Sequence, residues 1–170
     1  KIGQEPIDAA GSRVLLEVQK LDTSSIVALV GHPIHVMMVH FPVAFVVATL
    51  GVDVFYWWSG DDFWVRVGLW SSGMAFWSGV AASIVGTAEL LLVRGIRLLE
   101  ASWSHAVAAM TLVAMAGANW GLRLVDPASV LPHGLVLSAI STVMVGFAGW
   151  HGGKLVFDHG VGILVSQQKH

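Results

Sequence analysis

Cysteine is absent from this 170-residue sequence, and that absence excludes several kinds of site. Without a thiol the chain forms no disulfide, binds no zinc through thiolates, holds no cysteine-ligated iron–sulfur cluster and attaches no c-type haem. Charge is scarce as well, because 12% of the residues are charged whereas soluble domains carry roughly 25%. The net charge of −2 gives no reason to expect a nucleic-acid partner. The composition therefore argues against a water-soluble globular domain.

Hydrophobic residues, in contrast, are abundant and make up 55% of the sequence. Four uncharged stretches of 19 to 22 residues lie along the chain. This length matches the roughly 20 apolar residues that a helix needs to cross a bilayer. The stretches cover residues 34–52, 67–88, 101–122 and 134–153. We therefore predict an integral membrane protein whose first partner is the lipid bilayer.

Short connections join these stretches, so consecutive helices should run antiparallel. The predicted fold class is all-α, an integral membrane four-helix up-down bundle, with a short N-terminal amphipathic helix at about residues 11–21. The predicted organisation is an N-terminal arm (1–30), a four-helix transmembrane domain (31–165) and a tail (166–170). The spans are expected at about residues 34–57, 64–92, 102–124 and 133–156.

Basic residues are distributed unevenly over this topology. Seven of the nine Lys and Arg residues fall on the side of the bundle that carries both termini. The positive-inside rule places that side in the cytoplasm, which predicts a multi-pass protein with both termini cytoplasmic. Asp53, Arg66 and Arg123 are expected near the opposite mouth of the bundle, where they can pair with one another.

Histidine is abundant for so apolar a chain, with 8 histidines against 9 Lys plus Arg. Six of the eight fall on the side of the termini, at or beside three of the spans. Each predicted helix contributes one polar side chain at about one level, and these are His40, Glu89, His105 and His151. Polar groups inside a membrane are functional candidates by default, so this convergence predicts a cofactor or metal site.

A b-type haem is the cofactor that the pattern favours, because imidazole ligates iron and helical bundles hold haem between facing helices. By depth the preferred axial pair is His40 with His151, followed closely by His40 with His105. Arg97 is among the cations expected to meet the haem propionates. The alternatives are a non-haem metal ion held by His40, His105 and His151, a proton relay through Glu89, and a cofactor-free structural or anchor subunit.

His35 is a further histidine of the first span, and it lies about 140° around the helix from His40. The two side chains are therefore not expected to serve the same ligand plane.

Two segments resemble the motifs of a known family. The sequences GHPIHVMMVHFP at residues 31–42 and GGKLVFDHGVG at residues 152–162 resemble the opening and closing motifs of a bacterial family of four-helix integral membrane proteins of unknown function. The resemblance covers residues 31–165. Glu89 stands where the family has an acidic residue ending the second helix, and His105 matches a histidine opening the third. His32, His35 and His159 match the two motifs.

The resemblance adds expectations about function. Some members of the family are fused to Rieske-type iron–sulfur domains, which implies redox chemistry, and a bacterial family implies the inner (cytoplasmic) membrane. Because His151 is not part of the family motif, the resemblance favours His40 with His105 as the axial pair. It assigns no role to His32, His35 or His159, although the predicted cofactor-binding set of His40, His105, His151, His35, Glu89 and Arg97 includes His35. With the histidine pattern, it predicts a haem-b electron-transfer subunit of a larger redox or respiratory complex. Its expected partners are other membrane or redox subunits and quinone.

No nucleophile–base pair, phosphate-binding loop or substrate motif is evident along the sequence. We therefore do not expect this chain to catalyse a reaction by itself.

Overall fold

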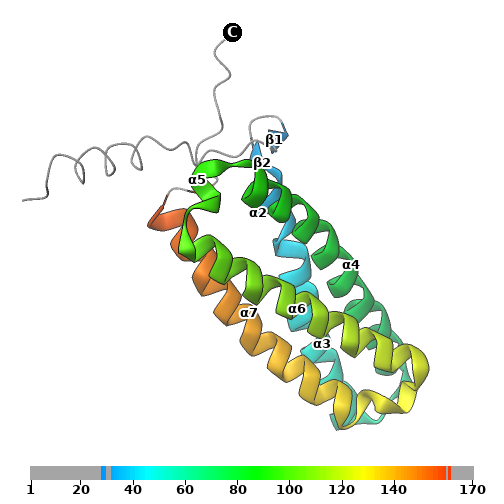
Figure 1. The fold of residues 1–170 in the computed structure, drawn as a ribbon. Helices are drawn as coiled ribbons and strands as arrows, with labels where there is room; N and C mark the ends of the chain where they lie inside the picture. The colour runs from blue at the N-terminus through cyan, green and yellow to red at the C-terminus, as the bar shows by residue number, and fades with distance from the viewer. Residues whose placement is uncertain (1–27, 30–31, 160, 162–170) are drawn as a thin grey trace, which may run out of the picture.

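The computed structural model describes residues 28–29, 32–159 and 161 (Figure 1). The amphipathic helix predicted at residues 11–21 and the tail at 166–170 lie outside the described residues. A two-residue antiparallel ladder pairs β1 (Ala28–Leu29) with β2 (His32–Pro33). The other elements are helical: α2 (Ile34–Met38), α3 (His40–Ser59), α4 (Asp62–Leu92), α5 (Arg94–Arg97), α6 (Glu100–Val125), the 3-10 helix η1 (Pro127–Val130) and α7 (His133–Phe157).

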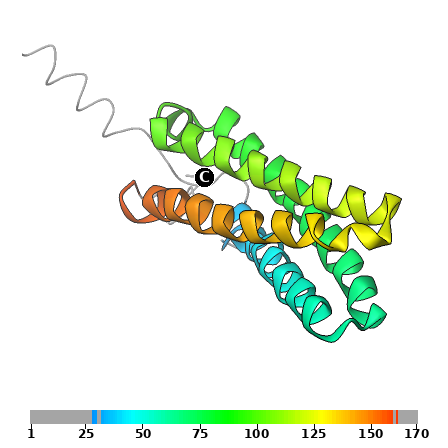
Figure 2. The same ribbon diagram turned by 90° about the horizontal axis from the view of Figure 1, so that it is seen from below.

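Four helical segments are long and apolar enough to cross a membrane, namely 34–59, 62–92, 100–125 and 133–157. They confirm the predicted all-α membrane bundle, and consecutive segments run antiparallel (Figure 1). Helix α3 packs against α4 and α7, and α6 packs against the same two helices (Figure 2). As a result, α3 and α6 lie diagonally opposite each other across the bundle.

The turn between α3 and α4 depends on Gly60 and Asp61. Gly60 adopts the left-handed conformation with φ of 65°, and its N–H donates to the Tyr56 carbonyl at 2.8 Å. Glycine is favoured there because other side chains clash at positive φ. The Asp61 carboxylate then caps α4 by accepting the Phe63 N–H at 2.8 Å. These two caps allow a tight reversal that brings α3 and α4 side by side.

The first membrane helix is interrupted at Val39, where α2 ends and α3 begins one residue later. Pro42 accounts for the interruption, because proline has no N–H to donate to the carbonyl four residues earlier. The interruption lies between His35 and His40 along the first membrane helix.

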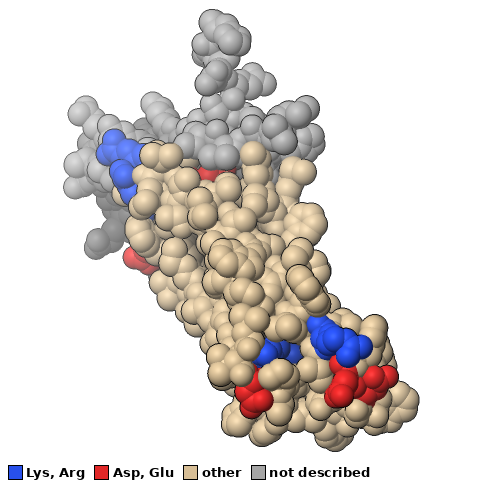
Figure 3. Space-filling view, turned by 90° about the vertical axis from the view of Figure 1, so that its right-hand side faces the viewer, with Lys and Arg blue, Asp and Glu red and all other residues tan. Residues whose placement is uncertain are grey.

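The centre of the bundle is apolar. Val46, Ala75, Leu112 and Ala116 form a buried cluster contributed by α3, α4 and α6. Large apolar side chains also cover the outside of the helices, and Figure 3 shows a broad uncharged band between two charged ends. An apolar outer surface of this extent is the surface that contacts lipid.

Candidate functional site

Two histidines face each other inside the end of the bundle near α5. His35 lies on α2 and His105 on α6, which belong to diagonally opposite sides of the bundle. Their ring centroids are 6.5 Å apart, and the ring planes make an angle of 77°. The two imidazoles therefore meet across the interior of the bundle with their ring planes nearly perpendicular.

Each ring is held by a backbone carbonyl of the following membrane helix. The His35 Nδ1 lies 3.0 Å from the Ala82 carbonyl oxygen on α4, and the His105 Nδ1 lies 3.1 Å from the Ala148 carbonyl oxygen on α7. A carbonyl oxygen only accepts hydrogen bonds, so Nδ1 carries the proton in both rings. In the neutral form of each ring, Nε2 then keeps a lone pair for a ligand or a metal.

A glycine four residues after each carbonyl makes room for the ring. A Cβ on Gly86 would lie 2.5 Å from the His35 Cε1, and a Cβ on Gly152 would lie 3.0 Å from the His105 Cε1. The first and second membrane helices are thus joined by the same kind of contact as the third and fourth. A histidine docks against an Ala-x-x-x-Gly segment of the next helix, and the two histidines meet in the middle.

A cavity of about 90 Å³ adjoins the two rings. Glu89 lines it and is buried, with 6% of its surface exposed. Ser102 lines it too, one turn before His105 on α6, with 3% exposed. The Ser102 Oγ has no hydrogen-bond partner among the described residues. Because a buried hydroxyl without a partner costs free energy, this oxygen indicates a ligand or a water in the cavity.

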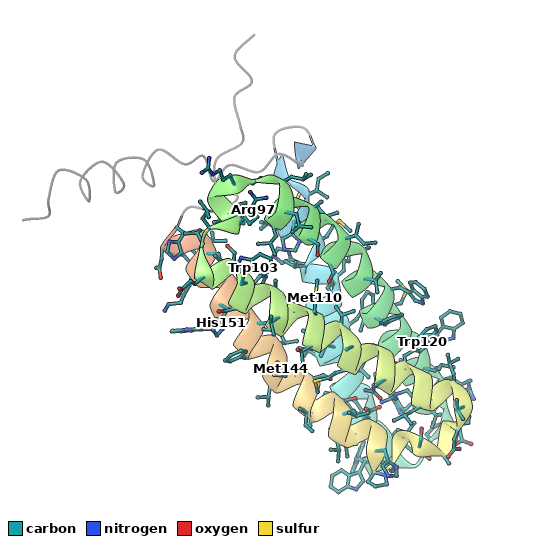
Figure 4. The ribbon with its side chains drawn as sticks, viewed as in Figure 1. Arg97, Trp103, Met110, Trp120, Met144 and His151 are labelled. Atoms are coloured by element: carbon teal, nitrogen blue, oxygen red, sulfur yellow. The ribbon has the colours of Figure 1, made fainter. Side chains whose placement is uncertain are left out.

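A groove on the outer surface adjoins this cavity between α4 and α6. Its volume is about 390 Å³. Three residues line both spaces and form the wall between them, and Figure 4 labels one of them, Met110 on α6. The groove is lined by Val80, Ser83, Ile84, Thr87, Met110 and Val113, and the shared residues are Ser83, Thr87 and Met110.

The pair preferred by depth, His40 with His151, is not the pair that the structure brings together. His40 is exposed, and its Nδ1 lies 3.3 Å from the Met37 carbonyl oxygen of its own helical segment. The His151 ring packs on Phe147 with centroids 4.3 Å apart, and its Nδ1 lies 2.9 Å from the Phe147 carbonyl oxygen. Neither His40 nor His151 lines the cavity. The prediction used only the depth of each residue along its helix, and depth does not determine which face of the helix a side chain occupies.

Of the remaining predicted site residues, some line the cavity and others lie outside it. Glu89 and His105 line the cavity, as described above. Arg97 is exposed at the end of the bundle (Figure 4), where its Nη1 donates to the Leu91 carbonyl at 3.0 Å. Within the part of the chain that the structure describes, no three His, Asp or Glu side chains gather closely enough to hold a metal ion. The predicted set of His40, His105 and His151 is therefore not assembled.

A second polar cluster lies toward the opposite end of the bundle. Asp53 on α3 and Arg123 on α6 form a buried ion pair, with 0% and 2% of their surfaces exposed. The two guanidinium nitrogens donate to the two carboxylate oxygens at 2.8 and 2.6 Å. The expected pairing of these two residues is confirmed, whereas Arg66 is exposed.

Further hydrogen bonds complete the ion pair. The Arg123 Nε donates to the Asn119 Oδ1 at 3.0 Å, and the Ser138 hydroxyl donates to the Asp53 Oδ2 at 2.6 Å. The Asn119 amide in turn donates to the Ser138 hydroxyl at 2.9 Å. A Cβ on Gly68 would lie 2.6 Å from the Arg123 Nη1, so glycine on α4 makes room for the guanidinium. All four membrane helices thus meet around one satisfied network.

Ser102 and the two Ala-x-x-x-Gly segments were missed as parts of the site. The segments 82–86 and 148–152 were visible in the sequence as small residues at four-residue spacing. Such spacing also serves ordinary helix packing in membranes, so it did not by itself indicate a histidine. The useful signal is that each segment follows a histidine-bearing helix.

A family model described as "Predicted membrane protein (DUF2231)" matches residues 31–164. No curated protein and no solved structure matched the chain.

Proposed function

Since this chain belongs to the DUF2231 family of predicted membrane proteins, we propose a function from the geometry of its histidine site. The description of the family names no ligand. The four-helix domain binds a b-type haem between His35 and His105 and carries single electrons. The observation that carries the proposal is the pair of imidazoles from opposite helices, each oriented by a carbonyl so that Nε2 keeps its lone pair. Two such nitrogens are what the axial positions of a haem iron require.

The separation of the rings supports this assignment. Metal–imidazole bonds of about 2 Å on each side of an iron would place two ring centroids roughly 6 Å apart. The observed separation of His35 and His105 is 6.5 Å. The absence of cysteine means that this chain offers no thiol for covalent attachment, which is consistent with a b-type rather than a c-type haem.

The cavity beside the two histidines is too small for a porphyrin macrocycle, so the additional volume would have to come from the outer groove between α4 and α6. The cavity alone, at about 90 Å³, holds a few water molecules. The side chains of Ser83, Thr87 and Met110 separate it from the outer groove of about 390 Å³. A macrocycle held by the two histidines would have to extend past these three side chains toward the groove between α4 and α6.

Other residues of the cavity have roles in this complex. The Ala82 and Ala148 carbonyls orient the two imidazoles and prevent their rotation. Ser102 supplies a buried hydroxyl that has no hydrogen-bond partner in the described part of the chain, and this hydroxyl could donate to a propionate carboxylate. Arg97 lies at the same end of the bundle, where it favours the negative charge of the propionates. When bound, the haem supplies reversible one-electron chemistry.

A proton relay is the second candidate function, and the small cavity favours it. A space of about 90 Å³ beside His35, Glu89, Ser102 and His105 suits a short chain of water molecules. This alternative requires no iron and predicts no visible absorbance.

The spectrum of the full-length protein, purified from a haem-replete membrane, tests the proposal. We expect a Soret band in the oxidised form and a sharp α band after reduction with dithionite, because two imidazoles produce a low-spin iron. The haem-to-protein ratio is to be measured by the pyridine haemochrome method and should approach one. Folded protein without a Soret band would overturn the haem proposal and leave the proton relay.

The orientation in the membrane forms part of the proposal. We propose that the protein lies in the bacterial inner membrane, with the α5 end in the cytoplasm, because most Lys and Arg residues belong to that side. In the same proposal it acts as a subunit of a larger redox complex, which would supply its electron partners.

Single cysteines test this orientation cleanly, since the chain has none of its own. We expect Ser59→Cys, at the exposed end of α3, to react with a membrane-impermeant maleimide on spheroplasts. Leu98→Cys, exposed beside α5, should react only after the membrane is opened. Labelling of Leu98→Cys but not Ser59→Cys on sealed spheroplasts would reverse the assignment.

A further inference from the structure

We propose that a small buried cavity beside the Asp53–Arg123 ion pair binds one internal water molecule, which joins the Ser141 hydroxyl to the polar network of the four membrane helices. Three observations carry this inference: a cavity of the size of one water, a buried hydroxyl without a partner in its lining, and neighbouring polar atoms with unused hydrogen-bonding capacity. The inference concerns the end of the bundle away from the histidine pair, and it does not rest on the proposed haem.

The cavity adjoins both the ion-pair network and the apolar cluster at the centre of the bundle. Its volume is about 10 Å³, and one water molecule needs roughly 10–15 Å³ of such space. Three members of the apolar cluster line it, together with the polar residues Thr49, Ser72, Asn119, Ser138 and Ser141. None of the lining residues is more than 5% exposed. The cavity therefore admits a single water, excludes a larger ligand and is closed to lipid.

The Ser141 hydroxyl is the clearest indication that a molecule binds there. Ser141 is 2% exposed, and its Oγ has no hydrogen-bond partner within the part of the chain that the structure describes. Hydroxyls inside helices can donate to the carbonyl four residues earlier, as Thr49 and Ser72 do at 2.7 Å each. Ser141 makes no such bond, and a buried hydroxyl without a partner costs free energy. A water in the cavity would accept its proton.

The other polar atoms of the lining can complete the bonds of this water. The Asn119 amide has two N–H groups, and its bond to Ser138 at 2.9 Å uses one of them, so the other can donate to the water. The two hydrogens of the water can then go to the oxygens of Thr49 and Ser72, whose own protons are given to carbonyls. With Ser141, this gives up to four bonds, within the usual two to four of a buried water. One water thus bridges α3, α4, α6 and α7.

The charges beside the cavity favour a neutral ligand. Hydroxyl and amide oxygens also suit a monovalent cation, so the oxygen atoms alone do not select water. The Arg123 Nε donates to the Asn119 Oδ1 at 3.0 Å, and its Nη2 lies 3.4 Å from the Ser138 Oγ. The negative charge of Asp53 is already paired with the same guanidinium. A second cation would therefore be repelled by a fixed positive charge that is bonded to the lining itself.

The side chain of Asn119 provides a direct test, because it is the single asparagine of the chain. The full-length protein is to be labelled with ¹⁵N-asparagine, placed in lipid nanodiscs and studied by NMR. We expect a cross-peak between the side-chain amide protons of Asn119 and the water frequency. In a rotating-frame experiment its sign should be that of dipolar contact and not of chemical exchange. Replacement of sodium chloride by choline chloride should leave this cross-peak unchanged.

Variants on α7 make the test specific to the cavity. Ser141→Val fills the cavity and removes the hydroxyl, so we expect the cross-peak to be lost. Ser141→Thr keeps the hydroxyl and adds a methyl group to the same space, and it should lose the cross-peak with less disturbance of the fold. Thr142→Val is the matched control, because Thr142 does not line the cavity and its hydroxyl donates to the Ser138 carbonyl at 2.9 Å. This control should keep the cross-peak.

Each outcome decides for or against the water. Folded wild-type protein without a dipolar cross-peak overturns the inference. A cross-peak that persists in both Ser141→Val and Ser141→Thr also overturns it, because the signal would then be relayed by the Ser138 hydroxyl, which lies 2.9 Å from the amide. Movement of the Asn119 signals on addition of sodium would identify a cation site instead. None of these results depends on the Soret band, so failure of the haem proposal leaves this inference standing.

Discussion

Replacement of His35 or of His105 by alanine is expected to abolish the Soret and α bands of the purified protein. Each ring supplies one of the two proposed axial nitrogens, and no other imidazole lines the cavity in the described part of the chain. The loss should be nearly complete rather than partial, because a non-covalent haem with a single protein ligand readily leaves a detergent-solubilised bundle. Absorbance ratios at constant protein concentration give the haem occupancy of each variant.

His40→Ala and His151→Ala are the matched controls. Both residues are histidines of the same end of the bundle, but their rings bond to carbonyls of their own helices. We expect both variants to keep wild-type occupancy. If His40→Ala removes the bands and His35→Ala does not, the axial assignment is wrong. Gly86→Val adds an independent check, because a Cβ there displaces the His35 ring without removing a ligand.

Replacement of Arg123 by leucine is expected to destabilise the bundle by about 3–5 kcal/mol, since it leaves the Asp53 carboxylate buried without its partner. Asp53→Leu should have an effect of similar size, because it leaves a buried guanidinium. Removing both charges together is expected to recover much of the loss, as a buried ion pair is often little better than an apolar pair of similar volume. Reversible unfolding in mixed micelles measures the free energy of each variant.

Arg66→Leu provides the control for this series. Arg66 is exposed near the start of α4, so its replacement should change the free energy of unfolding by no more than about 0.5 kcal/mol. Equal stability of Arg123→Leu and the wild-type protein would contradict the structural role of the pair. A double variant that is far less stable than either single variant would contradict the pairwise compensation.

The fold was predictable because hydropathy reports directly on the membrane. Four uncharged stretches of the right length require four spanning helices, and short connections require that they alternate in direction. The pairing of Asp53 with Arg123 was also within reach, because few charged residues lie near that mouth of the bundle.

The candidate site was less predictable, because it depends on the angle of each side chain around its helix. His40 and His151 have suitable depths, but their rings bond to their own helices. The His35 ring reaches the cavity by docking on the Ala82 carbonyl of α4, and this contact is a property of three-dimensional packing rather than of spacing. The separation of about 140° between His35 and His40 did indicate that the two side chains would not serve the same ligand plane.

The position of the histidine pair has a consequence for bioenergetics. His35 is the second residue of α2 and His105 the sixth of α6, so both lie within about 8 Å of a helix start at 1.5 Å per residue. The apolar cluster of Val46, Ala75, Leu112 and Ala116 follows them toward the opposite face. An electron that enters and leaves at this level crosses little of the transmembrane electric field, whereas full crossing involves about 2.3 kcal/mol per 100 mV. In the proposed electron carrier, electron exchange at this level is therefore expected to be electroneutral across the membrane and insensitive to the membrane potential.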